Sequence, residues 1–471
     1  MPAKRSTGLL LVFVFLVTAL RGSPQPRPPQ LANAYRQDHN GWIFVSLHGS
    51  PHQIGFQHGY LLAREINETL RMLVFYMERS TKRNWSFFRE NAVRMFWLKL
   101  EDQYRQEITG IVDGLRTRLP GSTWDPVDLT VLNGWIELAS YYVPYLDEKK
   151  QPGTGTNKAP GKCSAFIATG SWTRDKKIVI GHNNWSEYLV GQRWNVILDI
   201  KPQQGFRMMM DAMPGYIHSG DDFMINSAGL VYTETTISGF RGFNENGTPE
   251  FMRARQAAQY AATINDFARI MTTDNNGGYA NDWLIGDTKT NEIAKLELGL
   301  KNQLLWRTRD GCFIGANFPS DGKFIAEETT FDAGDESQSV LVRKKRWEKL
   351  MAEFKGEIDV ETGKLFESDH LDDATGLPGA NSNTLCGHND LDPRGLPEFS
   401  WKPFWPGGAV QAKVTSTALV RQMKFWARMG HPCGREFLAE PFLAAHPEFR
   451  WQTPFLRDMK ANSWTLFPGK K

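Results

Sequence analysis

The chain has 471 residues, of which 41% are hydrophobic, 23% charged and 12% aromatic. This composition excludes a disordered or collagen-like protein and predicts an ordered globular one with a large core. The 55 Lys and Arg residues against 52 Asp and Glu give a net charge of +3, which argues against a protein that binds nucleic-acid backbones.

Residues 1–22 have the features of a secretory signal peptide. Lys4 and Arg5 form a positive start, Gly8 to Leu20 is an apolar stretch of 13 residues, and Gly22 with Ser23 gives a small-residue exit. An uncleaved membrane anchor is the alternative, but the apolar stretch is short for a bilayer. We therefore expect a mature protein that is secreted or held in the lysosomal lumen.

A secreted chain can carry glycans on Asn-x-Ser/Thr sequences. Four such sequences are present, and they predict glycosylation at Asn67, Asn84, Asn184 and Asn246. Asn184 lies in a segment that we assign below to the candidate site, so a glycan there would obstruct that site.

The chain changes character near residue 150. A strand is predicted over 41–47 and helices over 54–79, 85–119 and 128–142, so residues 23–150 form a helical N-terminal segment. Residues 163–471 are predicted to form one domain with it. Strands are expected over 164–169, 178–181, 196–200, 206–211, 223–226, 230–236, 283–287, 293–298 and 312–316, and helices over 249–262, 264–271 and 337–354. The tail from about 363 looks loop-rich. This order predicts an α+β protein with stacked sheets between helical layers.

Cys163 stands at the junction between linker and strand. Residues 151–162 contain no large apolar side chain and form a predicted linker. If the chain is cut between Lys162 and Cys163, one residue carries both a thiol and an α-amine. An α-amine has a pKa of about 8, so it can take the thiol proton and make Cys163 both nucleophile and base. A plain buried cysteine that begins a strand is the alternative.

The next segment predicts which residues lie beside Cys163. If 164–169 and 178–185 pair as a hairpin around 173–174, Cys163 faces residues 183–185. The run Gly-His-Asn-Asn-Trp over 181–185 then brings His182 and Asn184 near the thiol. An imidazole and a carboxamide there could orient the amine and hold a substrate. For His182, a hydrogen-bonded histidine at a strand end is the other interpretation.

No metal or other cofactor is expected. The cysteines at 312, 386 and 433 show no Cys-x-x-Cys spacing, so no structural zinc site is predicted, and a Cys386–Cys433 disulfide is the expected pairing. The histidines at 48, 52 and 58 have no acid at ligand spacing and are interpreted as turn and helix-start residues. The basic run over 343–346 is interpreted as a solvated helix face.

Several short motifs in order give the sequence a family resemblance. Cys-Ser-Ala at 163–165 and Gly-His-Asn-Asn-Trp at 181–185 resemble the phospholipase B-like (lamina-ancestor) family of N-terminal-nucleophile hydrolases. Further matches are Met-Pro-Gly-Tyr at 213–216, Ser-Gly-Asp-Asp-Phe at 219–223, Gly-Leu at 229–230 with Glu-Thr-Thr at 234–236, the Asn-rich segment 274–283, and Gly-Gly at 407–408 with Ala-Lys-Val-Thr at 412–415. The segment 49–59 is similar to the opening that these proteins share with penicillin-side-chain acyltransferases.

The resemblance implies a four-layer αββα fold and autocatalytic cleavage at Lys162–Cys163. It implies an acyl-enzyme on Cys163 and an oxyanion hole, for which Asn317 at the end of a predicted strand supplies an amide donor. A turn asparagine before Phe-Pro is the other interpretation of Asn317. Arg343 corresponds loosely to an arginine of related hydrolases. A lipid or N-acyl small molecule is the implied substrate, with transient contact to membrane surfaces.

Three functions stay open from the sequence. The first is a phospholipase B-type acyl hydrolase that removes fatty acyl chains from glycerophospholipids. The second is an amidase or acyltransferase acting on small N-acyl compounds, because a cysteine attacks esters and amides alike. The third is a non-enzymatic lumenal binding protein with a vestigial pocket. The sequence leaves the oligomeric state undetermined.

Overall fold

The computed structural model describes residues 28–151, 163–220 and 223–469. The predicted signal peptide over 1–22 and nearly all of the predicted linker lie outside the described residues, as do Asp221 and Asp222 of the Ser-Gly-Asp-Asp-Phe motif. In the described part of the chain, no helix combines the length and the apolar character that crossing a membrane requires.

The N-terminal segment is helical, as predicted, but it contains more breaks than the sequence pattern indicates. The helix expected over 54–79 is two helices separated at Leu62, and the helix expected over 85–119 is also two. The helices of this segment are α1 (Pro51–Leu61), α2 (Ala63–Thr81), α3 (Trp85–Met95), α4 (Asp102–Arg118), α5 (Pro126–Ile136) and α6 (Val143–Lys150), with a π-helical stretch at Glu137–Tyr142 between the last two.

Glycines explain the motif at 49–59. A Cβ on Gly55 would lie 1.9 Å from the carbonyl oxygen of Glu107, and one on Gly59 would lie 1.9 Å from that of Ile111. These glycines therefore allow α1 and α4 to pack backbone against backbone, an approach that a larger residue would prevent. The motif has a packing role in this fold.

Two sheets form the centre of the molecule. The nine-stranded sheet has the order β1 (Tyr35–His39), β2 (Trp42–Gly49), β5 (Val196–Pro202), β6 (Met208–Ala212), β7 (Met224–Asn226), β8 (Leu230–Thr236), β9 (Asn281–Asp287), β10 (Glu292–Leu298) and β11 (Gln303–Thr308). The six-stranded sheet has the order β12 (Gly311–Gly315), β3 (Ser164–Thr169), β4 (Val179–Glu187), β15 (Gly407–Ser416), β16 (Phe425–Met429) and β17 (Thr465–Phe467). β2 and β5 pair in parallel, which inserts the N-terminal segment into the larger sheet.

The tail is not mainly loop, contrary to the sequence prediction. It contributes three strands to the six-stranded sheet, and β15 lies at the centre of that sheet, next to β4. The remaining short elements are α7 (Tyr188–Gly191), α10 (Gly322–Glu328), β13 (Leu371–Asp372), β14 (Leu377–Pro378), α13 (Thr417–Val420) and α14 (Ala439–Ala445).

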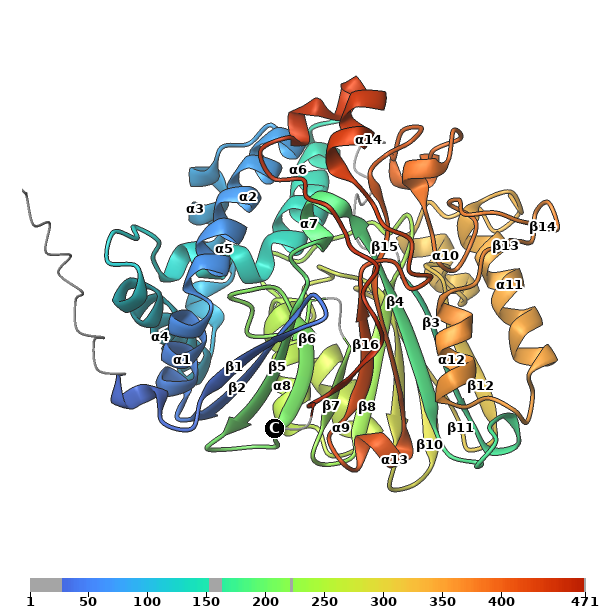
Figure 1. The fold of residues 1–471 in the computed structure, drawn as a ribbon, viewed down its shortest axis with the longest axis horizontal. Coiled ribbons are helices and arrows are strands. Elements are labelled where there is room, and N and C mark those ends of the chain that lie inside the picture. Colours follow the sequence, from blue (N-terminus) through green and yellow to red (C-terminus); the bar gives the residue numbers. More distant parts are fainter. Residues whose placement is uncertain (1–27, 152–162, 221–222, 470–471) are drawn as a thin grey trace, which may run out of the picture.

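The layers stack as helices, sheet, sheet and helices, so the predicted αββα fold is confirmed (Figure 1). The N-terminal helices, with α8 (Glu250–Tyr260) and α9 (Ile264–Thr272), pack on the outer face of the nine-stranded sheet. A second core, with Ile167 and Ile180 from one sheet and Met209 and Leu284 from the other, fills the space between the sheets. α11 (Ser339–Glu353) and α12 (Val360–Glu367) cover the outer face of the smaller sheet.

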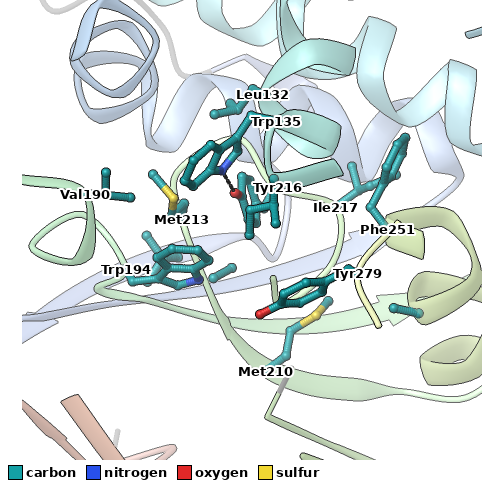
Figure 2. Packing of buried hydrophobic residues seen from close by; sticks show 14 of the residues in the cluster. Leu132, Trp135, Val190, Trp194, Met210, Met213, Tyr216, Ile217, Phe251 and Tyr279 are labelled. Carbon is teal, nitrogen blue, oxygen red and sulfur yellow. Dashed lines mark hydrogen bonds between the residues drawn. The ribbon is translucent and has the colours of Figure 1, made fainter. Parts of the chain in front are cut away.

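The Met-Pro-Gly-Tyr motif anchors the helical layer to the larger sheet. The Trp135 indole of α5 donates a hydrogen bond to the Tyr216 hydroxyl, and both rings are buried (Figure 2). The backbone N–H of Gly215, which has φ +91°, donates to Nε2 of His58 at 3.0 Å. His58 is thus a packing residue, whereas His52 forms an exposed pair with Asp113.

A buried carboxyl predicts how stability depends on pH. Burial raises the pKa of Glu137 from 4.5 to about 7, although Asn276 of the Asn-rich motif donates to it. Between these pH values the folded chain holds a proton that the unfolded chain has lost. The protonated carboxyl of Glu137 therefore makes its full contribution to the free energy of unfolding below pH 4.5, and this contribution is lost as the pH rises through 7. It amounts to about 3 kcal/mol.

We expect Glu137→Gln to remove this pH dependence, because glutamine keeps a neutral acceptor for Asn276 but has no proton to lose. Urea unfolding at a series of pH values from 4 to 8 measures the effect. The wild-type chain should lose stability across that range relative to Glu137→Gln. Parallel pH curves for the two proteins would refute the assignment.

Candidate active site

Cys163 lies at the start of β3, and the predicted hairpin register is confirmed. Ser164 pairs with Asn183, and Ala165 pairs with His182. Continuing this antiparallel register by one residue places Cys163 opposite Asn184, within the predicted range of 183–185. The Cys163 side chain is 1% exposed.

The alternation of the two strands brings three predicted site residues to one face. Ala165 and Ile180 belong to the core between the sheets, whereas Phe166 and Val179 belong to the core under α11 and α12. Because side chains alternate along a strand, Cys163, His182 and Asn184 belong on the face that looks into the space between the sheets. Asn183 and Trp185 belong on the opposite face.

Arg343 of α11 reaches Cys163 from the outer face of the smaller sheet. The interpretation of residues 343–346 as a solvated helix face is therefore wrong for Arg343. Its side chain is fully buried, and its Nη1 donates to the carbonyl oxygen of Cys163 at 2.9 Å and to Oγ of Ser164 at 3.1 Å. The guanidinium also lies over the ring of Trp185 at 4.5 Å. Burial lowers the pKa of Arg343 to about 10, so the group is still charged at neutral pH.

The same guanidinium holds Asn317. Its Nη2 donates to Oδ1 of Asn317 at 3.1 Å, so one planar group binds both the main chain of Cys163 and the side chain of Asn317. Asn317 Nδ2 donates to the carbonyl oxygen of Thr236 at 2.7 Å and has a second N–H. The residue has φ +69°, in the left-handed region that favours glycine and asparagine. Its conformation is fixed by these contacts.

Further polar residues near these strands were not assigned a role from the sequence. Asp211 of β6 accepts hydrogen bonds from Gln411 at 2.7 Å, Lys413 at 3.0 Å and Ser219 at 3.0 Å, and all four side chains are fully buried. Gln411 pairs with Asn184 across β15 and β4. This ion-paired cluster joins the two sheets beside the site. In the sequence, this cluster could have been recognised from Asp211, a charged residue that directly follows three methionines in a predicted strand.

His182 lies two residue pairs further along the hairpin than Asn184. Its buried ring stacks on Phe223 with centroids 6.5 Å apart, and its neighbour across β15 is Lys413. The structure therefore brings Cys163, Asn184, Asn317 and Arg343 together around the start of β3, with His182 deeper between the sheets.

The four sequons differ in exposure. Asn84 and Asn246 are exposed, and Asn67 is half-buried in α2, where its side chain accepts a hydrogen bond from the Trp124 indole. Asn184 is only 2% exposed. The folded chain has no space for a glycan there, so the predicted glycosylation at Asn184 is incompatible with this fold.

The other cysteines require a correction. All four cysteines are free thiols in this structure, so the expected Cys386–Cys433 disulfide is not present. The thiol of Cys312, in the strand beside β3, is half-buried, and burial raises its pKa to about 11. It is therefore a protonated and weak nucleophile at neutral pH.

A pocket of about 470 Å³ opens beyond the end of β4, at the same end of the sandwich as Cys163, which does not itself line the pocket. Because β3 and β4 are antiparallel, the start of β3 and the end of β4 are adjacent, and Glu187 at the end of β4 lines the pocket. The other lining residues include an aromatic group, Phe399, Trp401, Trp405, Phe449 and Trp451, a basic group, Arg79, Lys82 and Lys402, and a second acid, Glu448. The pocket can hold an apolar chain beside an anionic group.

A family model described as phospholipase B matches residues 57–310, which is more than half of the chain. The chain belongs to the phospholipase B family. The matched region contains the β3–β4 hairpin with Cys163, His182 and Asn184, so the predicted resemblance is confirmed.

Individual relatives are distant. The chain is 23% identical to "Putative phospholipase B-like 1" of Caenorhabditis elegans over 410 residues, covering 79% of this chain and 69% of that protein. It is 26% identical to "Phospholipase B-like 1" of Homo sapiens over 263 residues, covering 50% and 47%. The chain thus spans about half of the human relative. A conjugated bile acid hydrolase structure from Clostridium perfringens is 9% identical, with a TM-score of 0.33 over 56% of this chain and 89% of that one.

Proposed function

We propose that this member of the phospholipase B family is an acyl hydrolase that removes fatty acyl chains from glycerophospholipids through Cys163. The observation that carries the proposal is the Arg343 guanidinium, which holds the main chain of Cys163 and the side chain of Asn317 together. A nucleophile and an amide donor fixed by one rigid group form a pre-organised site for acyl transfer.

The site is first made by self-cleavage. The Cys163 thiol attacks the carbonyl carbon of Lys162, and the peptide bond breaks as the acyl group moves to sulfur. Water then hydrolyses this thioester and leaves Cys163 with a free α-amine. An uncut chain has no such amine, so we expect the precursor to be inactive.

Catalysis then repeats the same chemistry on a lipid. The α-amine takes the thiol proton, the thiolate attacks the ester carbonyl, and the second N–H of Asn317 stabilises the oxyanion. The ammonium returns the proton to the departing alcohol, which leaves an acyl-thioester on Cys163. The amine next takes a proton from water, and the resulting hydroxide releases the fatty acid.

The pocket favours a lipid over a small N-acyl compound. Its aromatic lining suits an acyl chain, and its basic residues suit a phosphate, which is the combination found in a glycerophospholipid. We place this activity in the secreted or lysosomal lumen, where Glu137 would be protonated and stabilising at acidic pH.

The test is a side-by-side assay of the cleaved protein on mixed micelles of phosphatidylcholine and on fatty acyl amides of small amines. We expect free fatty acid from the phospholipid at a rate at least about 10-fold above that from the amides, because the pocket would bind the phosphate. Faster release from the amides would instead identify an amidase. No release from either substrate by a cleaved chain would refute the hydrolase proposal.

A further inference from the structure

A second cluster of chemically active side chains lies on the far side of β4 from the space between the sheets. Four residues form it: His370, Cys386, His388 and Cys433. His370 precedes β13, Cys386 and His388 lie in the loop after β14, and Cys433 lies in the loop after β16. One ligand atom from each of the four lies within 4.8 Å of every other. The members of the cluster come from three separate loops, so the sequence shows no Cys-x-x-Cys spacing that would indicate a metal site.

The distances fit a tetrahedral metal site. Nε2 of His388 lies 3.5 Å from Sγ of Cys386 and 3.5 Å from Sγ of Cys433. Zinc bonds of about 2.3 Å to sulfur and 2.0–2.1 Å to nitrogen, set at tetrahedral angles, separate the two ligand atoms by about 3.6 Å. Two thiols and two imidazoles at this spacing are a typical ligand set of structural zinc sites.

The surroundings of the cluster also suit a metal. Cys386 and His388 are fully buried, and the backbone N–H of Arg435 points at Sγ of Cys433 at 3.4 Å. The other ring nitrogen of His388, Nδ1, lies 3.9 Å from a carboxylate oxygen of Asp390. The negative charge of this carboxylate would attract a proton on Nδ1. Metal-bound histidines commonly have such an outer carboxylate.

The neighbouring His431 has a different role. Its Nδ1 lies 2.7 Å from the carbonyl oxygen of Ala409, and its ring packs against His388 with centroids 4.2 Å apart. It therefore supports His388 from behind, and the four other residues complete a closed set of ligands. Closed four-ligand sites are structural, whereas catalytic zinc sites keep an open position.

We infer that His370, Cys386, His388 and Cys433 bind one structural zinc ion, which clamps three loops behind the active site. Binding deprotonates both thiols and releases two protons to solvent. The clamp acts on residues that support catalysis. The carbonyl oxygen of Leu385, next to Cys386, accepts hydrogen bonds from Asn183 and from the indole of Trp185, and that indole packs under Arg343.

The test is the metal content of the full-length protein purified without chelators and supplied with zinc during expression. We expect about one zinc per chain by inductively coupled plasma mass spectrometry. Cys386→Ala and Cys433→Ala should each lower the zinc content at least 10-fold. Cys312→Ala is the matched control, because Cys312 lies in β12, outside the cluster, and this variant should keep its zinc.

A second measurement covers the case in which the variants fail to fold. Replacing zinc by Co²⁺ in the wild-type protein should give the visible absorption of tetrahedral cobalt with a thiolate-to-metal band. A metal-free protein, with Cys386 and Cys433 either joined as a disulfide or both alkylated as free thiols, would overturn the inference. So would zinc that stays bound in a folded Cys386→Ala variant.

Discussion

Cys163→Ala should abolish both chain cleavage and lipid hydrolysis. The substitution removes the only atom that we assign to attack the Lys162 carbonyl and the substrate ester. We expect the variant to remain a single chain and to lose at least about 10³-fold in kcat/KM, since loss of a nucleophile leaves only residual binding effects. Gel analysis of the purified chain and a fatty-acid release assay measure the two effects.

Cys312→Ala provides the control for this experiment. Cys312 pairs with Ala168 on the neighbouring strand, so it has a similar setting, but burial raises the pKa of its thiol to about 11. This variant should cleave itself and hydrolyse lipid like the wild-type protein. If Cys163→Ala kept full activity, or if Cys312→Ala lost it, Cys163 would not be the nucleophile.

Arg343→Met should have the second-largest effect, on both stability and rate. The buried carbonyl oxygen of Cys163 and Oδ1 of Asn317 would each lose a charged donor. Buried acceptors left without a partner cost about 1–3 kcal/mol each. We expect kcat to fall at least about 100-fold, because the nucleophile and the oxyanion donor would no longer be held together.

Two further variants separate positioning from simple loss of charge. Arg343→Lys keeps the charge but cannot bind both groups with a planar fork, so we expect an intermediate kcat. Lys344→Met, on the same helix, removes an exposed pair with Glu348 and a contact of the ammonium with the Phe318 ring at 5.6 Å, and should change little. The measurements are kcat and KM for each folded variant. A change in KM with kcat unchanged would contradict a positioning role for Arg343.

The part of the site that sequence could predict is the local part. The β3–β4 register follows from one short connection and from the alternation of apolar residues, so the position opposite Cys163 could be deduced within one residue. The strands at 164–169 and 230–236 begin and end where predicted. Leu62 was missed because a break between two helices leaves the apolar periodicity largely intact.

The rest depends on contacts between distant segments. β15 was missed because Gln411 and Lys413 interrupt its apolar pattern, and they do so because they face Asp211 between the sheets. The basic run over 343–346 was interpreted as solvated because such a run does not say which member points inward, and only the family resemblance pointed to Arg343 as a site residue. Trp347, four residues later and buried, shares its helix face and was the signal that could have identified it.

N-terminal sequencing of the chains in purified, active protein tests the central claim most directly. We predict a second chain that begins Cys-Ser-Ala-Phe, with the thiol and the free α-amine on the same residue. An unbroken chain through residues 162 and 163 that still releases fatty acid from phospholipid would contradict the mechanism.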